Sequence, residues 1–347
     1  MKIPIVILNW NGLEDTLECM SSIEKQSYPN YKIYLVDNGS NGDDAQILDQ
    51  TFRSKEWVKL IKNKENLGFT KGNNEVLQKY ILTNPDYKYV LLLNNDTVLD
   101  KDWIAELVNS AEKNKAHIVS SKMVNYFDHS RMDNAGHQML NTGEIIPIGF
   151  NESVDQYNST FDNMGACAGA ALYDVDMLRK IGVFDPYFST GYEDAEIGVR
   201  ANVLGYKTIF EPKAIIYHKI SQSVSKIRDY SYIRQIQINT YYSYFKLMPV
   251  GVILINLPSI LFKTISILTI SLLTFRKKLL QILINAKYII FFKEWKKIMS
   301  SRNRFFAEQC PIQNWCILRK LRFFLLFDIY RFYKFILFKK KTTFENW

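Results

Sequence analysis

Short apolar runs alternate with amphipathic stretches through the first third of the chain. The spacing of Leu17, Met20 and Ile23 predicts a helix directly after the first apolar run. Strands alternating with helices indicate βα units and a mostly parallel sheet, an α/β fold. The expected strands are residues 3–8, 31–36, 58–61 and 89–93, and further helices are expected at residues 44–52, 72–82 and 103–113.

The pattern changes after residue 125. Residues 125–160 are polar and irregular, which predicts either an active-site loop or a small antiparallel excursion. Residues 164–171 (MGACAGAA) are small enough to let backbones approach closely. Two helices are then expected, at residues 175–181 and 193–204, followed by two extended pieces at residues 207–210 and 215–218.

A long apolar stretch, residues 247–275, carries Lys263 as its one charge. It is long enough for a hydrocarbon layer of about 30 Å, although Pro249, Gly251 and Pro258 interrupt it. Basic and aromatic residues alternate beyond it, at 287–297 and 319–341, as in helices that bind the surface of an anionic membrane leaflet. A spanning helix, a hairpin and an interfacial helix all fit this pattern, and so does a helical subdomain with a solvated basic face.

Charge is distributed unevenly along the chain. Residues 276–347 contain 17 Lys/Arg and 4 Asp/Glu, a net charge of +13, so the total of +9 leaves −4 for the rest. A basic tail favours an anionic partner, and the neighbouring apolar stretch makes membrane lipids a better partner than nucleic acid. Four scattered cysteines suggest neither a metal site nor a disulfide framework. They fit reduced thiols in the cytosol, and the N-terminus leads into a strand without a signal-peptide pattern.

Polar residues follow the expected strands. Asp37 lies in Asp-Asn-Gly-Ser and Asp96 in Asn-Asn-Asp, each where an apolar run ends. In open α/β sheets, ligands bind in the crevice outside the carboxyl ends of the strands. The same residues also suit turns and helix caps, so position alone leaves both interpretations open.

Six motifs in order give the chain a family resemblance. It resembles the family 2 glycosyltransferases and, within them, a bacterial rhamnosyltransferase-like branch. The motifs are residues 4–12 (PIVILNWNG), 35–40 (LVDNGS), 66–74 (NLGFTKGNN), 91–98 (LLLNNDTV), 191–200 (GYEDAEIGVR) and 211–221 (EPKAIIYHKIS). The resemblance implies a GT-A fold, a Rossmann-like mixed sheet flanked by helices. We therefore expect a catalytic domain at residues 1–225 and a helical membrane-associating region at 226–347.

The resemblance also implies a divalent cation, Mg²⁺ or Mn²⁺, that neutralises the leaving diphosphate. Residues Asn94, Asn95 and Asp96 match the family's Asp-x-Asp motif with Asn in first place. Asp96 is then a metal ligand, Asn94 offers a carbonyl or holds a metal-bound water, and His218 matches a ligand of some relatives. The missing first carboxylate removes one negative charge from this site.

Glu193 and Asp194 open an expected helix. By resemblance Asp194 is the general base of an inverting transfer, and Glu193 orients the acceptor or supports Asp194. The alternative is that both are acids favoured by the helix dipole.

The nucleotide-sugar donor is expected along the first three motifs. Asp37 matches the position that reads the base, and Asn9 and Asn11 line the same pocket. The residues expected beside the nucleoside and diphosphate are Asn66, Gly68, Lys71, Asn73 and Asn95.

The sequence thus predicts transfer of a sugar, first of all L-rhamnose from dTDP-L-rhamnose, to a lipid-linked or cell-surface saccharide. UDP- and GDP-sugars stay open, as does an oligomeric state. The expected place is the cytoplasmic face of the cell membrane. The alternatives are a degenerate, non-catalytic membrane partner and a sugar-1-phosphate nucleotidyltransferase. The second requires a Gly-rich basic signature near the N-terminus, where this chain has Asn9, Trp10, Asn11 and Gly12.

Overall fold

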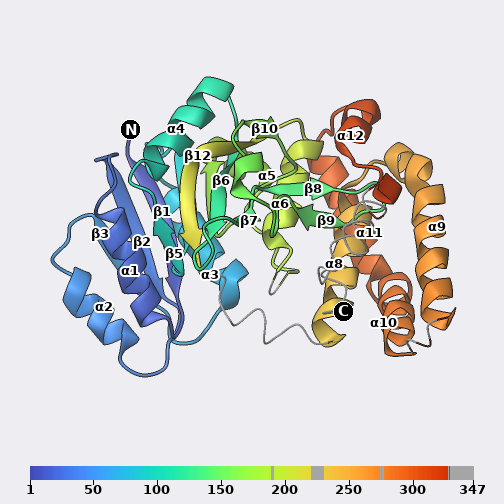
Figure 1. Cartoon of the computed structure of the whole chain (residues 1–347), viewed down its shortest axis with the longest axis horizontal. Coiled ribbons are helices and arrows are strands. Elements are labelled where there is room, and N and C mark those ends of the chain that lie inside the picture. Colours follow the sequence, from blue (N-terminus) through green and yellow to red (C-terminus); the bar gives the residue numbers. More distant parts are fainter. Residues whose placement is uncertain (189–190, 220–229, 274, 276, 327, 329–347) are drawn as a thin grey trace. The chain divides into compact units, whose positions relative to one another are not determined.

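The computed structural model of the chain describes residues 1–188, 191–219, 230–273, 275, 277–326 and 328. The chain divides into two compact units (Figure 1). The N-terminal unit comprises Met1–His137, Pro147–Asn202 and Tyr206–Ser221, and the C-terminal unit comprises Gln138–Ile146, Val203–Gly205 and Gln222–Trp347. Nothing in the sequence pattern marks Gln138–Ile146 as part of the second unit, and the boundary expected between residues 225 and 226 stays a prediction.

The N-terminal unit contains a mixed sheet. Its described strands run in the order β10-β12-β6-β11-β4-β1-β2-β3, with β5 beside β12 and β7 beside β6. Neighbours β4, β1, β2 and β3 are parallel, whereas β11 is antiparallel to both β4 and β6. The strands are β1 (Ile3–Asn9), β2 (Tyr31–Asp37), β3 (Val58–Lys62), β4 (Tyr89–Asn94), β5 (Thr97–Leu99), β6 (Ile118–Asn125), β7 (Met132–Asn134), β10 (Phe161–Asp162), β11 (Ala170–Asp174) and β12 (Thr208–His218).

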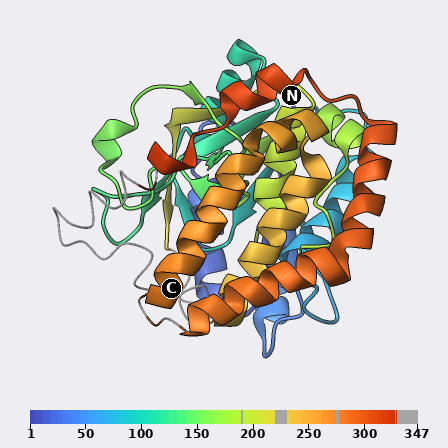
Figure 2. The ribbon, with the colours of Figure 1, turned by 90° about the vertical axis from the view of Figure 1, so that its right-hand side faces the viewer.

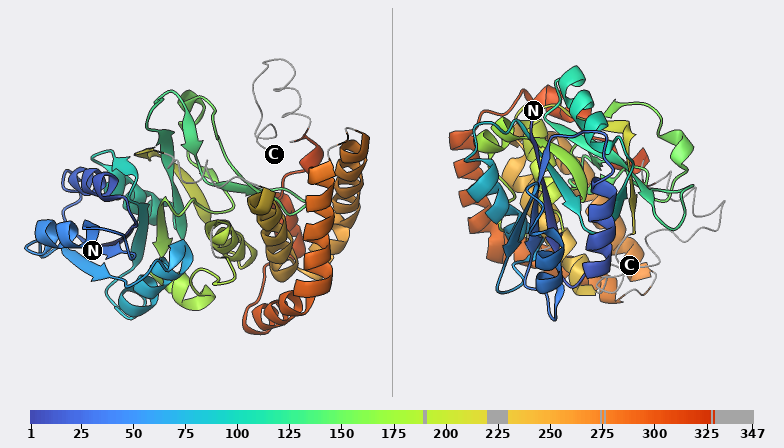
Figure 3. Two further views of the ribbon diagram at one scale, coloured as in Figure 1. Left: turned by 90° about the horizontal axis from the view of Figure 1, so that it is seen from below. Right: turned by 90° about the vertical axis from the view of Figure 1, so that its left-hand side faces the viewer.

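Helices cover both faces of this sheet, as the right-hand panel of Figure 3 shows. Alternate residues of a strand point to opposite faces. Ile3, Ile5 and Ile7 join one apolar core with α1 (Leu13–Ile23), α2 (Asp44–Phe52) and α4 (Trp103–Asn114). Leu8 points to the other face, where it lies against Gly72 of α3 (Gly68–Val76). The remaining helices of the unit are η1 (Leu77–Ile81), η2 (Val154–Gln156), α5 (Val175–Ile181) and α6 (Glu193–Val203).

The four strands and the helices expected in the first third of the chain are present, as are the helices expected at residues 175–181 and 193–204, but the part between residues 118 and 174 departs from the prediction. Strands β6 and β11 were not expected, because their serines and small residues break the apolar pattern. In β6 the buried hydroxyl of Ser121 accepts a hydrogen bond from Trp103 Nε1 at 2.8 Å, which satisfies a polar atom inside the core. The two expected extended pieces form the single strand β12, with a register shift between Glu211 and Ile215.

The structure also decides one open alternative and moves the start of one expected helix. Residues 125–160 form the antiparallel excursion, in which β7 pairs with β6 and β8 (His137–Met139) pairs with β9 (Ile145–Pro147). The helix expected at residues 72–82 begins earlier, at Gly68, and continues into η1.

The described part of the C-terminal unit is mainly helical. Its helices are α8 (Tyr230–Leu247), α9 (Val250–Leu273), α10 (Lys277–Tyr288), η3 (Ile289–Glu294), α11 (Trp295–Glu308) and α12 (Asn314–Lys320). Helix α8 packs against α10 and α11, and α9 packs against α10 and α12. The apolar stretch therefore forms one helix, with Pro258 inside it.

Among the described helices, one has the length and composition to cross a membrane. It is the part of α9 at Val250–Thr269, with a mean hydropathy of 1.9 and 17% of the tested window buried. A core helix of a soluble protein can have the same length and composition, so these two properties alone are weak evidence for a membrane segment. Residues 220–221 of the sixth motif and 329–341 of the last basic stretch lie outside the described residues.

Candidate active site

Strand ends bring the expected donor-binding residues to one edge of the sheet. Asn9, Asp37 and Asn94 end β1, β2 and β4, which are parallel neighbours. His218 ends β12, which pairs with β5 directly after the Asn-Asn-Asp motif. The carboxyl ends of parallel strands share one edge, so the fold confirms that these residues lie where open sheets bind ligands.

The Asn9 side chain links the loops after β1 and β2. It is fully buried, and its Nδ2 lies 2.9 Å from Asp37 Oδ1, 3.1 Å from Ser40 Oγ and 3.1 Å from Asp44 Oδ2. The other Asp37 oxygen accepts the Ser40 amide hydrogen at 3.3 Å. Asp37 thus stabilises its own turn, as its cap interpretation requires. Each carboxylate oxygen can accept a second hydrogen bond, so a role in reading a base stays compatible with this geometry.

Asn11 has a left-handed backbone, with φ of 53°. Its amide donates to Ser40 Oγ at 2.9 Å, and its Oδ1 accepts the Asn41 amide hydrogen at 2.7 Å. Asn tolerates this conformation better than most residues do. The Asn-Trp-Asn-Gly loop is therefore fastened to the Asn-Gly-Ser loop, and both form one wall of the site.

The third motif is held by Asn38. Its Nδ2 donates to Asn66 Oδ1 at 3.0 Å, and Asn66 Oδ1 also accepts the Gly68 amide hydrogen at 2.8 Å. Gly68 has φ of 73° and opens α3. Lys71 is exposed in the first turn, whereas Asn73 is buried and donates within the helix to Phe69 O at 3.0 Å. Because its side chain is exposed, Lys71 can reach a ligand. The side chain of Asn73 is bonded within the helix, so its expected contact with the donor stays a prediction.

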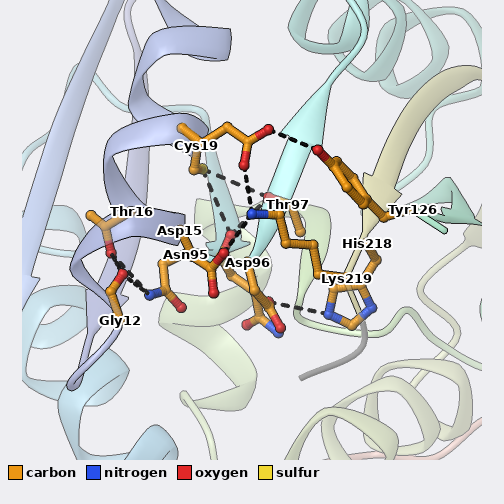
Figure 4. A network of polar contacts seen from close by, with 12 residues as sticks. Gly12, Asp15, Thr16, Cys19, Asn95, Asp96, Thr97, Tyr126, His218 and Lys219 are labelled. Carbon is orange, nitrogen blue, oxygen red and sulfur yellow. Dashed lines mark hydrogen bonds and ion pairs between the residues drawn. The ribbon is translucent and has the colours of Figure 1, made fainter. Parts of the chain in front are cut away.

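Within the Asn-Asn-Asp motif the three side chains have different surroundings (Figure 4). Asn95 Nδ2 donates to Thr16 Oγ1 at 2.9 Å and contacts Gly12 O at 3.3 Å, which ties β4 to the start of α1. Asp96 is buried, and its Oδ1 lies 3.2 Å from His218 Nε2. A Cβ added to Gly169 would lie 2.9 Å from Asn94 Nδ2, so this glycine is required beside Asn94.

The Asp96–His218 pair fits a divalent cation. Two neighbouring ligands of an octahedral ion with bonds of about 2.1 Å lie about 3 Å apart, close to the 3.2 Å between Asp96 Oδ1 and His218 Nε2. His218 Nδ1 lies 2.8 Å from Asp133 Oδ2. That pairing fixes the ring so that Nε2 faces Asp96, the outer-shell arrangement typical of metal-binding histidines. No group of three His, Cys, Asp or Glu side chains that could hold a metal is found among the described residues.

Without a metal, His218 carries a proton between two acids. Burial lowers the pKa of His218, but the hydrogen bonds that its ring donates to Asp133 and Asp96 outweigh burial and raise the pKa to about 10. An imidazole binds a metal only in its neutral form, so a cation would take the place of the Nε2 proton.

Lys219 fastens the end of β12 to α1. Its amide donates to Asp96 O at 3.0 Å, and its ammonium contacts the carboxylates of Asp15 and Glu18 (Figure 4). Tyr126 donates to Glu18 Oε1 at 3.0 Å and lies under the Lys219 ammonium. The hydrogen bond from Lys219 lowers the pKa of Glu18. This cluster holds the backbone next to His218 in register with Asp96.

Glu193 and Asp194 begin α6, as the motif predicts, but their surroundings differ. Asp194 is half-buried, and its two oxygens accept the amide hydrogens of Ala168 at 3.1 Å and Ala195 at 2.7 Å. Glu193 is buried, and its Oε2 has no hydrogen-bond partner among the described residues. Burial, and next the charge of Asp194, raise the pKa of Glu193 to about 8. Glu193 therefore holds its proton near neutral pH, whereas the Asp194 carboxylate is held by two amide donors.

Three polar groups near Asp194 were missed by the sequence analysis. The buried groups of His137, Cys167 and Tyr173 all feel the charge of Asp194. Burial lowers the pKa of His137 and raises that of Tyr173, and Asp194 opposes the first shift and adds to the second. His137 lies in β8, Cys167 in the loop before β11 and Tyr173 in β11, so no linear motif joins the three. Asp133 was missed for the same reason.

The small-residue stretch makes a packing contact. A Cβ on Gly165 would lie 2.6 Å from Gly198 Cα, and one on Gly198 would lie 2.5 Å from Gly165 Cα. The backbones of this stretch and of α6 therefore touch, which brings Ala168 to Asp194.

Comparisons with known proteins show the family and the fold of the chain. The family described as Glycosyl transferase family 2 matches residues 5–182. A poly-beta-1,6-N-acetyl-D-glucosamine synthase of Staphylococcus epidermidis is 21% identical over 223 residues, 64% of this chain and 51% of that protein. The amylovoran biosynthesis glycosyltransferase AmsB of Erwinia amylovora is 22% identical over 231 residues, 63% of this chain and 70% of that protein.

A solved structure of GalNAc-T7 with UDP, GalNAc and Mn²⁺ superposes with a TM-score of 0.55 and 17% identity, covering 71% of this chain and 50% of that one. The chain spans about half the length of this protein and of the Staphylococcus synthase. The chain belongs to glycosyl transferase family 2, and its mixed sheet flanked by helices confirms the expected GT-A fold.

Proposed function

We propose that this chain is an inverting glycosyltransferase that moves a sugar from a nucleotide diphosphate to a saccharide used in a cell-surface polysaccharide. The observation that carries the proposal is the presence of two groups of side chains with different chemistry. Asp96, in the turn after β4, and His218, at the end of β12, form a pair that would hold a cation, and Asp194, a carboxylate with two amide donors, opens α6. Family membership and the relatives named above support the polysaccharide-type acceptor.

The donor site is proposed along the loops after β1, β2 and β3. Asn9 and Asp37 would contact the base, and the Asn66–Gly68 turn with Lys71 would contact the diphosphate. Asp96 and His218, with Asn94 beside them, would hold a Mg²⁺ or Mn²⁺ ion. The bound ion would supply neutralisation of the charge that grows on the leaving diphosphate. Because Mg²⁺ sites commonly use one or two protein ligands with substrate phosphates, a two-residue protein contribution is sufficient.

Asp194 would take the proton of the acceptor hydroxyl as its oxygen attacks the anomeric carbon. The new bond forms between that oxygen and the carbon, and the bond to the nucleotide diphosphate breaks on the opposite side, which inverts the configuration. The amide hydrogen bonds from Ala168 and Ala195 hold the Asp194 carboxylate in place for this step. Glu193, which keeps its proton, would orient the acceptor as a hydrogen-bond donor.

The first donor to test is dTDP-L-rhamnose, which rests on the resemblance of the motifs to the rhamnosyltransferase-like branch. The test is hydrolysis of dTDP-, UDP- and GDP-sugars by the purified chain with Mg²⁺, Mn²⁺ or EDTA, beside Asp194→Asn. We expect metal-dependent hydrolysis of one donor that falls sharply in the variant. No hydrolysis and no nucleotide binding by calorimetry would favour the alternative, a non-catalytic membrane partner. Binding without hydrolysis would require repeating the assay with saccharide acceptors.

A further inference from the structure

Helix α9 reverses the usual arrangement of a surface helix. Its side chains turned towards the rest of the C-terminal unit include Asn256, Ser259, Lys263 and Thr264. Its exposed side chains are large and apolar, and they include Leu254, Ile255, Leu261, Phe262, Ile265 and Leu272. Ile265 is 62% exposed while Asn256 is 5% exposed. A helix that faces water carries its polar residues outward, so the medium outside α9 is not water.

Three of the inward polar side chains, Ser259, Lys263 and Thr264, are paired over roughly one and a half turns of the helix. Asn141 Nδ2 donates to Ser259 Oγ at 3.0 Å, and Lys263 Nζ lies 3.0 Å from Glu144 Oε1 and 3.5 Å from Asp328 Oδ2. Further along, Lys287 Nζ donates to Thr264 Oγ1 at 2.7 Å. These contacts fix the rotation of α9 about its axis. They keep the apolar face turned outward.

The same contacts argue against a helix that crosses a bilayer. If α9 crossed the bilayer, the Asn141–Glu144 turn and the Lys263 ion pairs would lie at the centre of the hydrocarbon layer. Irregular backbone and charge at that depth are costly unless other protein encloses them. The helices beside α9 do not suit this role, because α10 begins with Lys277 and Lys278, and no other described helix has the composition of a span.

We propose that α9 lies in the plane of an anionic lipid surface, with its outward face inserted among the acyl chains. This inference stands independently of the donor and acceptor. Charge decides between lipid and a second copy of the chain. Exposed Phe291 and Phe292 are followed by exposed Lys293, Lys296 and Lys297, and residues 276–347 carry a net charge of +13. Aromatic and basic side chains of this kind suit the head-group level of an anionic leaflet. In a two-fold contact the same basic segment would face itself.

Figures 1 and 2 show that the outward side of α9 is accessible within its unit. In Figure 1 it is the outermost labelled helix of the C-terminal unit, and in Figure 2 no other described helix of this unit lies in front of it. Within its own unit, the outward side of α9 is therefore not covered by another described helix.

The first test is sedimentation of the full chain with vesicles of phosphatidylcholine, with and without phosphatidylglycerol. We expect binding to the anionic vesicles that weakens at high salt. The double substitution Phe262→Ser and Ile265→Ser should weaken it at least about tenfold, because two large apolar side chains no longer enter the lipid. The matched control is Phe127→Ser with Ile47→Ser, two exposed apolar residues of the N-terminal unit, which should leave binding unchanged.

The second test separates an in-plane helix from a spanning one. Leu254→Cys, Leu261→Cys and Leu272→Cys are made singly in a background with Cys310→Ser and Cys316→Ser, since those two thiols are exposed. Each is labelled with a fluorophore, with the unsubstituted background as the blank. A quencher near the head groups should quench all three positions alike. Much weaker quenching at Leu261 than at Leu254 and Leu272 would place the middle of α9 deeper than its ends, as in a spanning helix, and would overturn the proposal.

A second copy as the occupant is also distinguishable. Light scattering after size exclusion should give the same mass for the parent chain and for the Phe262→Ser, Ile265→Ser variant. If the parent is a dimer that this variant dissociates while vesicle binding persists, the face belongs to a second copy. Equal binding to both vesicle types, unaffected by the substitutions, would likewise overturn the lipid assignment.

Discussion

In the N-terminal unit, strands β1 and β4 bury apolar side chains along their length and place polar side chains at one edge of the sheet. In the C-terminal unit, α9 turns Asn256, Ser259 and Lys263 inward beside the apolar Val252 and Ile260, and it exposes several large apolar side chains. Buried polar groups usually have a partner, and the partners of Ser259 and Lys263 hold that face of α9 inward. The comparison teaches that the faces of a helix indicate its surroundings. The face whose polar side chains have partners packs against protein, and the opposite face is exposed to the outer medium. We propose that lipid, and not water, covers the outward face of α9.

The largest expected effect is the loss of transfer rate when the proposed general base is replaced. Asp194→Asn should lower the transfer rate about 10²- to 10⁴-fold, because the amide cannot accept the acceptor proton. Initial rates with donor and acceptor at saturation measure this. Asp176→Asn, which changes an exposed acid of α5, should leave the rate unchanged. A full rate in Asp194→Asn would assign the base to another residue.

The next effect contrasts the two regions directly. Leu172→Ala, at a fully buried position of β11, should lower the free energy of unfolding by about 2–5 kcal/mol. Phe262→Ser, on the outward face of α9, should change it by less than about 0.5 kcal/mol in buffer without lipid. Urea unfolding monitored by fluorescence measures both. An equally large loss for Phe262→Ser would mean that other protein covers this face.

A smaller effect tests whether Asp133 orients His218. Asp133→Ala should raise the Mn²⁺ concentration for half-maximal activity about 10- to 100-fold, because the ring is no longer held with Nε2 towards Asp96. The rate at saturating metal should recover, whereas a merely structural lesion would lower it. Asp133→Asn keeps a hydrogen-bond acceptor and should lie between. Asp128→Asn, an exposed acid between β6 and β7, is the matched control.

A separate effect is the pH dependence of stability that Glu193 contributes. Its pKa is raised in the folded chain, to about 8, so the folded state holds a proton that the unfolded state releases above its own pKa. Its contribution to stability is therefore complete below about pH 4.5 and is lost as the pH rises through about 8. In that interval the slope is at most about 1.4 kcal/mol per pH unit. Glu193→Gln should flatten the pH dependence of urea unfolding between these values. An unchanged slope would show that Glu193 is ionised in the folded chain.

Much of the fold follows from local pattern, because a buried parallel strand and an amphipathic helix each leave a periodic signal. The bounds of α2 and α5 agree with the pattern residue by residue. The pattern did not predict strands β6 and β11. Ser121, which accepts a hydrogen bond from Trp103, and the small residues before Leu172 interrupt the apolar runs. The site divides in the same way. Asn9, Asp37, Asp96, Asp194 and His218 lie in motifs, whereas Asp133, His137 and Tyr173 reach the site only through the fold.

By itself, the sequence determined the family, the order of the first strands and helices, and the apolar and basic character of the C-terminal region. Each of these depends on the type and spacing of residues along the chain. The tertiary structure alone decided that Asp133 orients His218, that Glu193 is buried while Asp194 receives two amide hydrogen bonds, and which face of α9 points outward. These depend on hydrogen-bond partners and burial, which are set by contacts between residues distant in the sequence.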